Sequence, residues 1–222
     1  MGYKLDDKDI KLTNKRMTKI GNGANGDVYK YRNMALKIFR DDRKAPIDYY
    51  TAEYLTNIST DRILLPENLL FYNNTFKGYT HKLVTKKGTQ RIIMLPKFEF
   101  IQNIRILERD IEILSNKNVL LNGVSPDNTI FNGDLYLIDP SEYRVLDTDS
   151  HENLESINKY QLHLLLISLM VSELKKNNFS SQVQSEVKEL FEMKDNNVNS
   201  SDFFSDIINN NDTVKQFVKR MK

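Results

Sequence analysis

Residues 124–139 read VSPDNTIFNGDLYLID. Within this stretch, Asn132-Gly133 separates two short apolar runs. This is a strong signal for a tight β-hairpin, because a type I′ turn needs positive φ at both central positions. A polar residue stands at each end of the hairpin, since Asn128 precedes the first strand and Asp139 follows the second. A hairpin places the ends of its two strands side by side, so the sequence predicts two oxygen ligands that can share one cation.

A glycine-rich stretch, GNGANGDV at 21–28, lies far upstream of this hairpin. It matches G-x-G-x-x-G-x-V through Gly21, Gly23, Gly26 and Val28. Glycines at this spacing permit a tight turn and let backbone N–H groups approach phosphates, although the pattern alone also suits an ordinary flexible hairpin turn. A dinucleotide-binding site would need a helix directly after the glycines, whereas the β-rich sequence DVYKY follows here.

The next strand-like run carries a lysine that could reach the same phosphates. It contains Ala35-Leu36-Lys37, which resembles the V-A-I-K strand of protein kinases, and this resemblance implies that the lysine neutralises the α- and β-phosphates of a nucleotide. Such a lysine needs an acid to hold it in place, and Glu53 in the following predicted helix is the obvious partner. The alternative is a solvated strand lysine and a solvated helix acid.

In this order, the motifs resemble the signature of the protein-kinase-like superfamily, and the resemblance covers residues 17–140. It implies an α+β, two-lobed fold with a small antiparallel β N-lobe plus one helix, and a mainly helical, reduced C-lobe. It also implies that ATP binds in the interlobe cleft with Mg²⁺, whose ligands would be Asn128 and Asp139. The nucleotide-binding residues that it implies are Gly21, Gly23, Gly26, Val28, Ala35, Lys37 and Glu53.

The sequence also departs from the family pattern. The catalytic aspartate of protein kinases stands five residues before the metal-binding asparagine, and here Gly123 occupies that position. Ser125 replaces the lysine of the same loop, Pro140 follows the metal-binding acid, and no Ala-Pro-Glu motif occurs downstream. We therefore expect a pseudokinase-like protein that binds ATP with Mg²⁺, in which phosphotransfer is weak, atypical or absent. Two alternatives stay open: an active, divergent Ser/Thr-type kinase or nucleotidyl transferase, and a scaffold that no longer binds nucleotide.

The chain length fits a single domain with two lobes. We expect residues 1–222 to form that domain, with an N-lobe over 1–84, a hinge region over 85–97 and a C-lobe over 98–222. Periodicity and turn signals predict strands at 17–20, 27–31, 34–39, 69–72, 79–84, 129–131 and 135–138, and helices at 46–58, 101–114, 155–173, 181–194 and 212–221. The Asn-rich stretches 195–201 and 209–211 are expected to be surface loops.

The amino-acid composition limits the kinds of ligand and partner that we expect for this chain. The chain contains no cysteine and only three histidines, which excludes thiolate chemistry and disfavours a zinc site. A net charge of +2 disfavours a dedicated nucleic-acid binder. The start MGYKLDDKDI is too polar for a secretory signal, and the apolar stretch Leu162–Val171 is too short to span a bilayer. We expect a cytoplasmic protein that binds a nucleotide, with a protein substrate or partner left open and with no membrane or nucleic-acid partner. The Asn-, Lys- and Ile-rich composition would suit an AT-rich bacterial genome.

Overall fold

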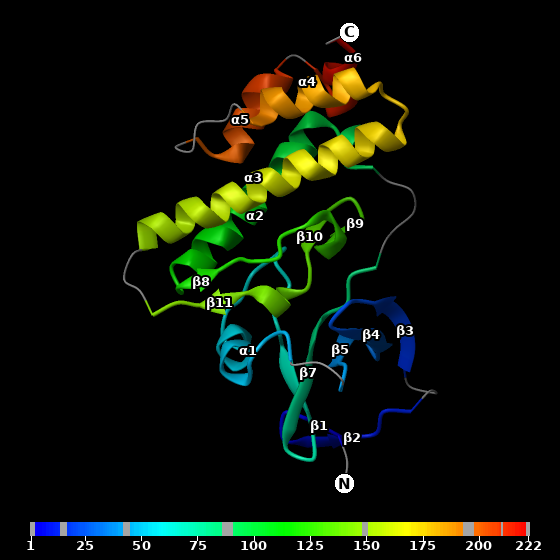
Figure 1. The fold of residues 1–222 in the computed structure, drawn as a ribbon, viewed down its shortest axis with the longest axis vertical. Helices are drawn as coiled ribbons and strands as arrows, with labels where there is room; N and C mark the ends of the chain where they lie inside the picture. Colours follow the sequence, from blue (N-terminus) through cyan, green and yellow to red (C-terminus); the bar gives the residue numbers. More distant parts are fainter. Residues whose placement is uncertain are drawn as a thin grey trace.

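The computed structural model describes the chain over residues 3–13, 17–41, 45–85, 91–147, 151–192, 198–209 and 211–220. Over this part of the chain the fold is α+β. A seven-stranded antiparallel sheet and helix α1 (Tyr49–Thr56) form one end of the molecule, and helices α2 to α6 form the other (Figure 1). Two short strand pairs lie between the two ends. Among the described helices, none has both the length and the apolar character needed to cross a membrane.

The sheet has the strand order β2-β1-β6-β7-β5-β4-β3. Its strands are β1 (Tyr3–Leu5), β2 (Lys8–Ile10), β3 (Met17–Asn22), β4 (Gly26–Tyr31), β5 (Met34–Phe39), β6 (Asn68–Tyr72) and β7 (Thr75–Lys82). The predicted strands within residues 17–84 are confirmed, with shifts of a few residues at their ends. Strands β1 and β2 were not predicted, because each has only three residues and is too short to show a period.

Helix α1 is shorter than the predicted helix over 46–58. It begins at Tyr49 because Asp48 caps it: the Asp48 carboxylate accepts a hydrogen bond from the Thr51 N–H at 2.9 Å. The cap fixes which side chains face the core, and these are Thr51, Ala52 and Leu55.

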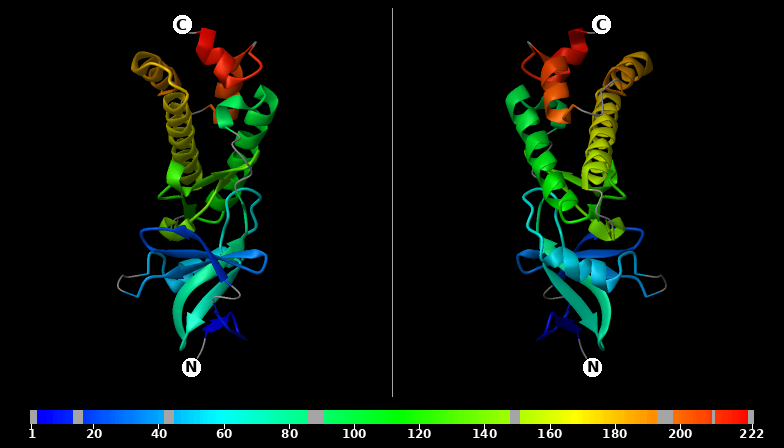
Figure 2. Two further views of the ribbon diagram at one scale, coloured as in Figure 1. Left: turned by 90° about the vertical axis from the view of Figure 1, so that its right-hand side faces the viewer. Right: turned by 90° about the vertical axis from the view of Figure 1, so that its left-hand side faces the viewer.

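The helical end is built from five helices in the described chain. They are α2 (Lys97–Ser115), α3 (His151–Lys176), α4 (Ser181–Glu192), α5 (Ser200–Ile208) and α6 (Val214–Arg220). Helix α2 packs against both α3 and α5, and Figure 2 shows this arrangement from two sides. The prediction at 181–194 is confirmed to Glu192, and its last residues lie outside the described chain. Helix α5 was missed; it begins inside a stretch that was expected to be a loop, and it buries Phe204 and Ile208.

The predicted hairpin is present as β9 (Thr129–Phe131) and β10 (Leu135–Leu137). Its turn differs from the two-residue type I′ turn that Asn132-Gly133 predicts. The register leaves three residues in the loop, and Gly133 has positive φ (103°) whereas Asn132 does not. The reason is that the Asn132 side chain accepts a hydrogen bond from the Asp134 N–H at 3.3 Å, a local contact that draws a third residue into the turn.

The predicted hinge region over 85–97 carries the chain from the sheet to the helical end. Residues 86–90 of this region lie outside the described chain. Beyond them, a short 3₁₀ turn at Ile92–Met94 buries Ile92 and Ile93, and α2 follows directly after Pro96. One continuous hydrophobic core extends from Phe39 in the sheet to the helices of the other end.

A carboxylate on α2 joins the sheet-side connection to the helical end. Asp110 is fully buried, and it accepts hydrogen bonds from the backbone N–H groups of Asp61, Arg62 and Ile63 at 2.6–3.1 Å. The same connection runs beside the hairpin, because the Leu137 N–H donates to the Arg62 carbonyl at 2.9 Å. Asp110 therefore holds α2, the connection and β10 in a fixed relation.

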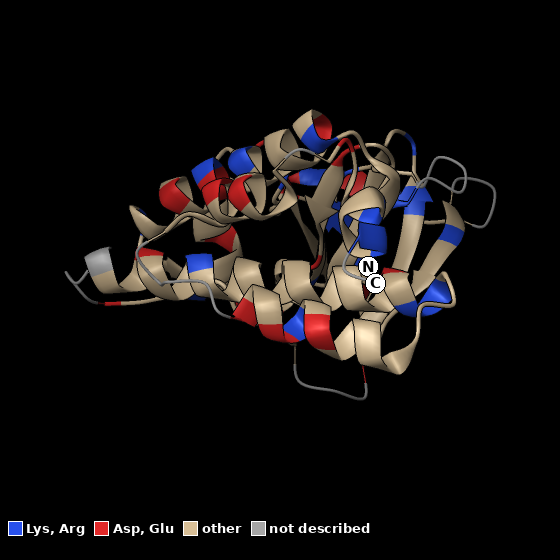
Figure 3. Ribbon diagram, turned by 90° about the horizontal axis from the view of Figure 1, so that it is seen from above, with Lys and Arg blue, Asp and Glu red and all other residues tan. Residues whose placement is uncertain are grey.

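Acidic and basic residues alternate along the helices when the molecule is viewed along its long axis. Figure 3 shows both signs side by side on the helices of this face. This mixture agrees with the small net charge of +2.

We predict that Asp110→Ala destabilises the protein by about 3 kcal/mol or more, because it leaves three backbone N–H groups without their charged acceptor. Urea denaturation measures the change. Glu112→Ala, an exposed acid on the same helix, is the control and should stay within about 0.5 kcal/mol of wild type. Equal effects of the two substitutions would contradict the role of Asp110.

Candidate functional site

A pocket of about 230 Å³ lies between the sheet and the β9–β10 hairpin. Strands β3, β4, β5 and β7 line it from one side, and the segment around the hairpin lines it from the other. The pocket brings together seven of the residues that the sequence singled out: Gly21, Gly23, Val28, Ala35, Lys37, Asn128 and Asp139. Gly26 and Glu53 are not among its lining residues.

The glycine-rich stretch forms the turn between β3 and β4, at the mouth of the pocket. The Gly23 N–H donates to the Gly26 carbonyl at 2.9 Å and closes the turn. Gly26 itself belongs to β4 and pairs with Phe39. A Cβ on Gly26 would lie 2.4 Å from the Ile38 carbonyl oxygen. Gly26 therefore serves the close approach of β4 to β5, and it is not among the residues that line the pocket.

Lys37 lies at the centre of the pocket and is 3% exposed. It occupies β5 between Val28 on β4 and Tyr79 on β7. Its Nζ donates to Asp139 Oδ1 and, at 2.7 Å, to Ser141 Oγ. Burial lowers the pKa of Lys37, while the charge and hydrogen bond of Asp139 act to raise it. The buried ammonium therefore depends on Asp139 as its counter-charge.

Glu53 does not reach Lys37 in this structure, contrary to the prediction. Its side chain is exposed, and its carboxylate accepts a hydrogen bond from the Tyr49 hydroxyl one turn earlier on α1. The phase of the helix explains the difference. With Thr51, Ala52 and Leu55 facing the core, residue 53 falls on the opposite side at 100° per residue.

Asp139 follows β10 and adopts a left-handed backbone conformation, with φ 65° and ψ 72°. Side chains other than Gly, Asn and Asp seldom take this conformation, and it turns the chain sharply into Pro140. The Asp139 carboxylate accepts hydrogen bonds from Lys37, from Ser141 and, at 3.2 Å, from the Tyr79 hydroxyl. Burial acts to raise the pKa of Asp139, but attraction to Lys37 and these hydrogen bonds outweigh it and lower the pKa below 3.8. Asp139 is therefore ionised at neutral pH.

Asn128 connects the hairpin to the loop before it. Its amide nitrogen donates to the Gly123 carbonyl at 2.8 Å, and its own carbonyl accepts from the Ile138 N–H at 2.9 Å. The amide nitrogen is thus engaged, and the amide oxygen is the atom that can take a cation.

The donor set fits a magnesium ion that also binds phosphate. Mg²⁺ takes one or two oxygen ligands from the protein and completes its octahedron with water and phosphate oxygens. Asn128 and Asp139 supply two such oxygens in one pocket. Within the described chain there is no cluster of three or more His, Cys, Asp or Glu residues that could hold a metal ion.

Tyr79 and His81, which line the pocket, and Ser141, which is hydrogen-bonded to Lys37, were not identified from the sequence. Tyr79 and His81 project from β7, where they stand opposite Lys37 and Ala35. Ser141 is buried, and it accepts a hydrogen bond from Lys37. Burial raises the pKa of Tyr79 well above 10 and lowers the pKa of His81, so both side chains are neutral at pH 7. The register between β5 and β7 places Tyr79 and His81 in the pocket, and that register cannot be read from a single sequence.

Gly123, at the position of the kinase catalytic aspartate, has φ 68°. A Cβ on this residue would lie 2.8 Å from Glu142 Oε2 and 2.9 Å from Glu142 Cδ. Both the backbone conformation and the neighbouring carboxylate therefore favour glycine here.

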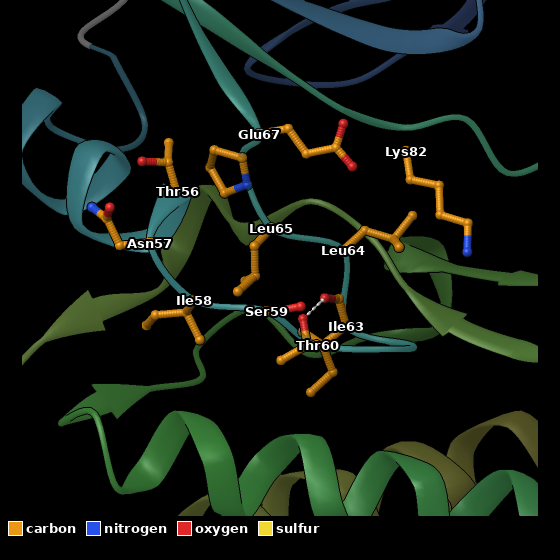
Figure 4. Close-up of a pocket in the computed structure, with 11 residues that line it drawn as sticks. Thr56, Asn57, Ile58, Ser59, Thr60, Ile63, Leu64, Leu65, Glu67 and Lys82 are labelled. Carbon is orange, nitrogen blue, oxygen red and sulfur yellow. Dashed lines mark hydrogen bonds between the residues drawn. The ribbon is translucent and has the colours of Figure 1, made fainter.

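A second pocket, of about 310 Å³, lies beside the C-terminal end of α1, and Figure 4 shows the residues that line it. The connection between α1 and β6 forms most of it, and the Thr60 hydroxyl donates to the Ile63 carbonyl within it. Glu67 and Lys82 are its charged lining residues. It contains none of the residues that the sequence singled out.

No protein-family model matches this chain, and no curated protein matches it. The function is therefore inferred from the residues of the pocket.

We predict that Lys37 and Asp139 are strongly coupled. Asp139→Asn should destabilise the protein by about 2–4 kcal/mol, because it leaves a buried ammonium without its counter-charge. Lys37→Met with Asp139→Asn should cost less than the sum of the two single substitutions, with a coupling of about 1–3 kcal/mol. Denaturant unfolding of wild type, both single variants and the double variant measures it.

The exposed pair Lys19–Asp27 provides the control cycle, at 2.8 Å and with side chains that are 46% and 27% exposed. Its coupling should stay below about 1 kcal/mol. A coupling for Lys37–Asp139 no larger than that of Lys19–Asp27 would contradict the prediction.

Proposed function

We propose that this pocket binds ATP with Mg²⁺, and that the protein is a divergent, two-lobed member of the protein-kinase-like superfamily. One observation carries the proposal: Lys37, Asn128 and Asp139, singled out as phosphate and metal residues from separate parts of the sequence, line a single pocket under the glycine turn. Lys37 and Asp139 are 102 residues apart in sequence, so their meeting is a property of the fold.

The walls of the pocket suit a nucleotide with one apolar and one charged end. Val28, Ala35, Val84, Ile130 and Ile138 supply apolar surface for the base. Lys37 pairs with Asp139 where the phosphates would lie, and Asp127 is the other charged lining residue. Ligand pockets combine an apolar lining with a few placed polar groups in the same way.

Binding of ATP with Mg²⁺ would replace the Lys37–Asp139 ion pair with two others, one between Lys37 and the phosphates and one between Asp139 and the metal. Without nucleotide, the Lys37 ammonium and the Asp139 carboxylate neutralise each other. With ATP present, Lys37 takes the phosphates as its counter-charge, while Asp139 and Asn128 hold the metal. The Mg²⁺ ion supplies charge neutralisation to the β- and γ-phosphates. The volume of about 230 Å³ is just below the roughly 300–1,000 Å³ of ligand pockets, and separation of Lys37 from Asp139 would enlarge it.

Residue 123 supplies no proton acceptor, because it is glycine. General-base assistance is worth about 10²–10⁴-fold. Positioning and charge neutralisation provide most of the catalysis of phosphoryl transfer. We therefore propose nucleotide binding. The rate of phosphoryl transfer then depends on whether another group takes the proton of the acceptor hydroxyl.

We predict that millimolar ATP with Mg²⁺ raises the melting temperature by several degrees, because a ligand at about 100 times its Kd adds roughly 2.7 kcal/mol to the free energy of unfolding. Chelation of Mg²⁺ by EDTA should remove most of the shift. Lys37→Met and Asp139→Asn should each reduce it strongly, as they remove the phosphate and metal partners.

The matched controls are Lys30→Met, an exposed lysine on β4, and Asp206→Asn, an exposed acid on α5. Both should retain the full shift. No Mg²⁺-dependent shift in wild type, or an unchanged shift in a Lys37→Met, Asp139→Asn double variant, would overturn the proposed function.

A further inference from the structure

The carboxylate of Glu142 occupies the space that a side chain on residue 123 would take. The built Cβ position of Gly123 lies 2.8 Å from Glu142 Oε2 and 2.9 Å from Cδ, both too close for real side-chain atoms. An acid from another segment thus stands where protein kinases carry the side chain of their catalytic aspartate. The sequence gives no hint of this contact, because it joins two segments whose spacing follows no known motif.

The local fold holds Glu142 in this place. Glu142 ends the 3₁₀ turn Pro140–Glu142, and the Tyr143 N–H closes that turn on the Pro140 carbonyl at 3.1 Å. Its neighbours Ser141 and Tyr143 are 1% and 2% exposed, so they anchor the backbone on both sides. The Glu142 side chain itself is exposed and can meet a molecule from solution.

Gly123 links Glu142 to Asn128. A Cβ on Gly123 would lie 2.8 Å from Glu142 Oε2, so the carboxylate lies beside the backbone of residue 123. The carbonyl of the same residue accepts a hydrogen bond from the Asn128 side chain at 2.8 Å. Burial lowers the pKa of Lys37, and the charge and hydrogen bond of Asp139 and then the charge of Glu142 act to raise it. Glu142 therefore lies next to the residue that holds the Asn128 side chain, and Asn128 lines the pocket.

We infer that Glu142 is the proton acceptor for phosphoryl transfer from ATP to a hydroxyl group, in place of the aspartate that residue 123 lacks. This inference rests on the proposed function. The acceptor oxygen forms a bond to the γ-phosphorus while the bond from that phosphorus to the β–γ bridging oxygen breaks. The bridging oxygen leaves with the electron pair as part of ADP, and the proton of the acceptor hydroxyl passes to the Glu142 carboxylate. Water is the simplest acceptor, and the products are then ADP and inorganic phosphate.

A purely structural Glu142 would behave differently. It would affect stability, or the charge around Lys37, without affecting the transfer step more than nucleotide binding. Glu142→Gln separates the two roles, because glutamine keeps the size and polarity of the side chain but does not take the proton. Glu189→Gln, an exposed acid on α4, is the matched control.

The first experiment measures ADP formation from ATP with Mg²⁺, in parallel with the thermal shift that the same ligand produces. Glu142→Gln should slow ADP formation by about 10²-fold or more, the worth of a general base, while its thermal shift stays at the wild-type value. Glu189→Gln should match wild type in both measurements. Equal rates for Glu142→Gln and Glu189→Gln would overturn the inference.

A relocated carboxylate provides a second test. Glu142→Ala clears the space beside Gly123, and Gly123→Asp in that background returns an acid from the neighbouring segment. Aspartate tolerates the left-handed backbone better than most residues. The double variant should form ADP at least tenfold faster than Glu142→Ala alone. A double variant that gives the same thermal shift with ATP but is no faster would assign Glu142 a structural role only.

A third readout does not depend on turnover. ADP with Mg²⁺ and aluminium fluoride mimics the transferring phosphoryl group with its attacking water, so it should stabilise wild type more than ADP with Mg²⁺ does. Glu142→Gln should lose that added shift and keep the shift with ADP.

If wild type responds to ATP with Mg²⁺ but forms no ADP, the inference fails and the proposed function stands. If ATP with Mg²⁺ produces no shift, the proposed function itself fails.

Discussion

The ion pair between the buried Lys37 and the half-buried Asp139 is the interaction on which the rest of the site depends. It joins β5 of the sheet to the segment after β10, across 102 residues of chain. Burial alone would favour a neutral lysine, and the adjacent carboxylate opposes this by giving the ammonium a partner. Because each charge is costly without the other, the pair brings the sheet and the hairpin together at this point. We propose that the same two charges favour a ligand that supplies both an anion and a cation.

The surrounding fold keeps this meeting point in place. Asp110 on α2 binds the backbone of residues 61–63, and that connection pairs in turn with β10. The left-handed conformation of Asp139 then directs the chain into the 3₁₀ turn that carries Ser141 under Lys37 and Glu142 beside Gly123. One short segment thus supplies the metal ligand that we propose, a hydrogen-bond partner of the lysine and the acid that we assign to proton transfer.

The sequence predicted those parts of the site that depend on local pattern. The three strands from Met17 to Phe39 and the β9–β10 hairpin follow from alternation and turn residues, and they place Lys37 on β5 and Asp139 just after β10. The side-chain contacts that are set by long-range packing could not be predicted from the sequence. Glu53 faces away because the Asp48 cap sets the phase of α1, and Glu142 meets Gly123 only through the tertiary fold.

A crystal structure with a non-hydrolysable ATP analogue and Mg²⁺ tests the central claim most directly. The account predicts that Lys37 leaves Asp139 and contacts the phosphates, with the metal held by Asn128 Oδ1 and the Asp139 carboxylate and the base between Val28 and Ile138. An analogue bound elsewhere on the protein, with the Lys37–Asp139 pair intact, would contradict it.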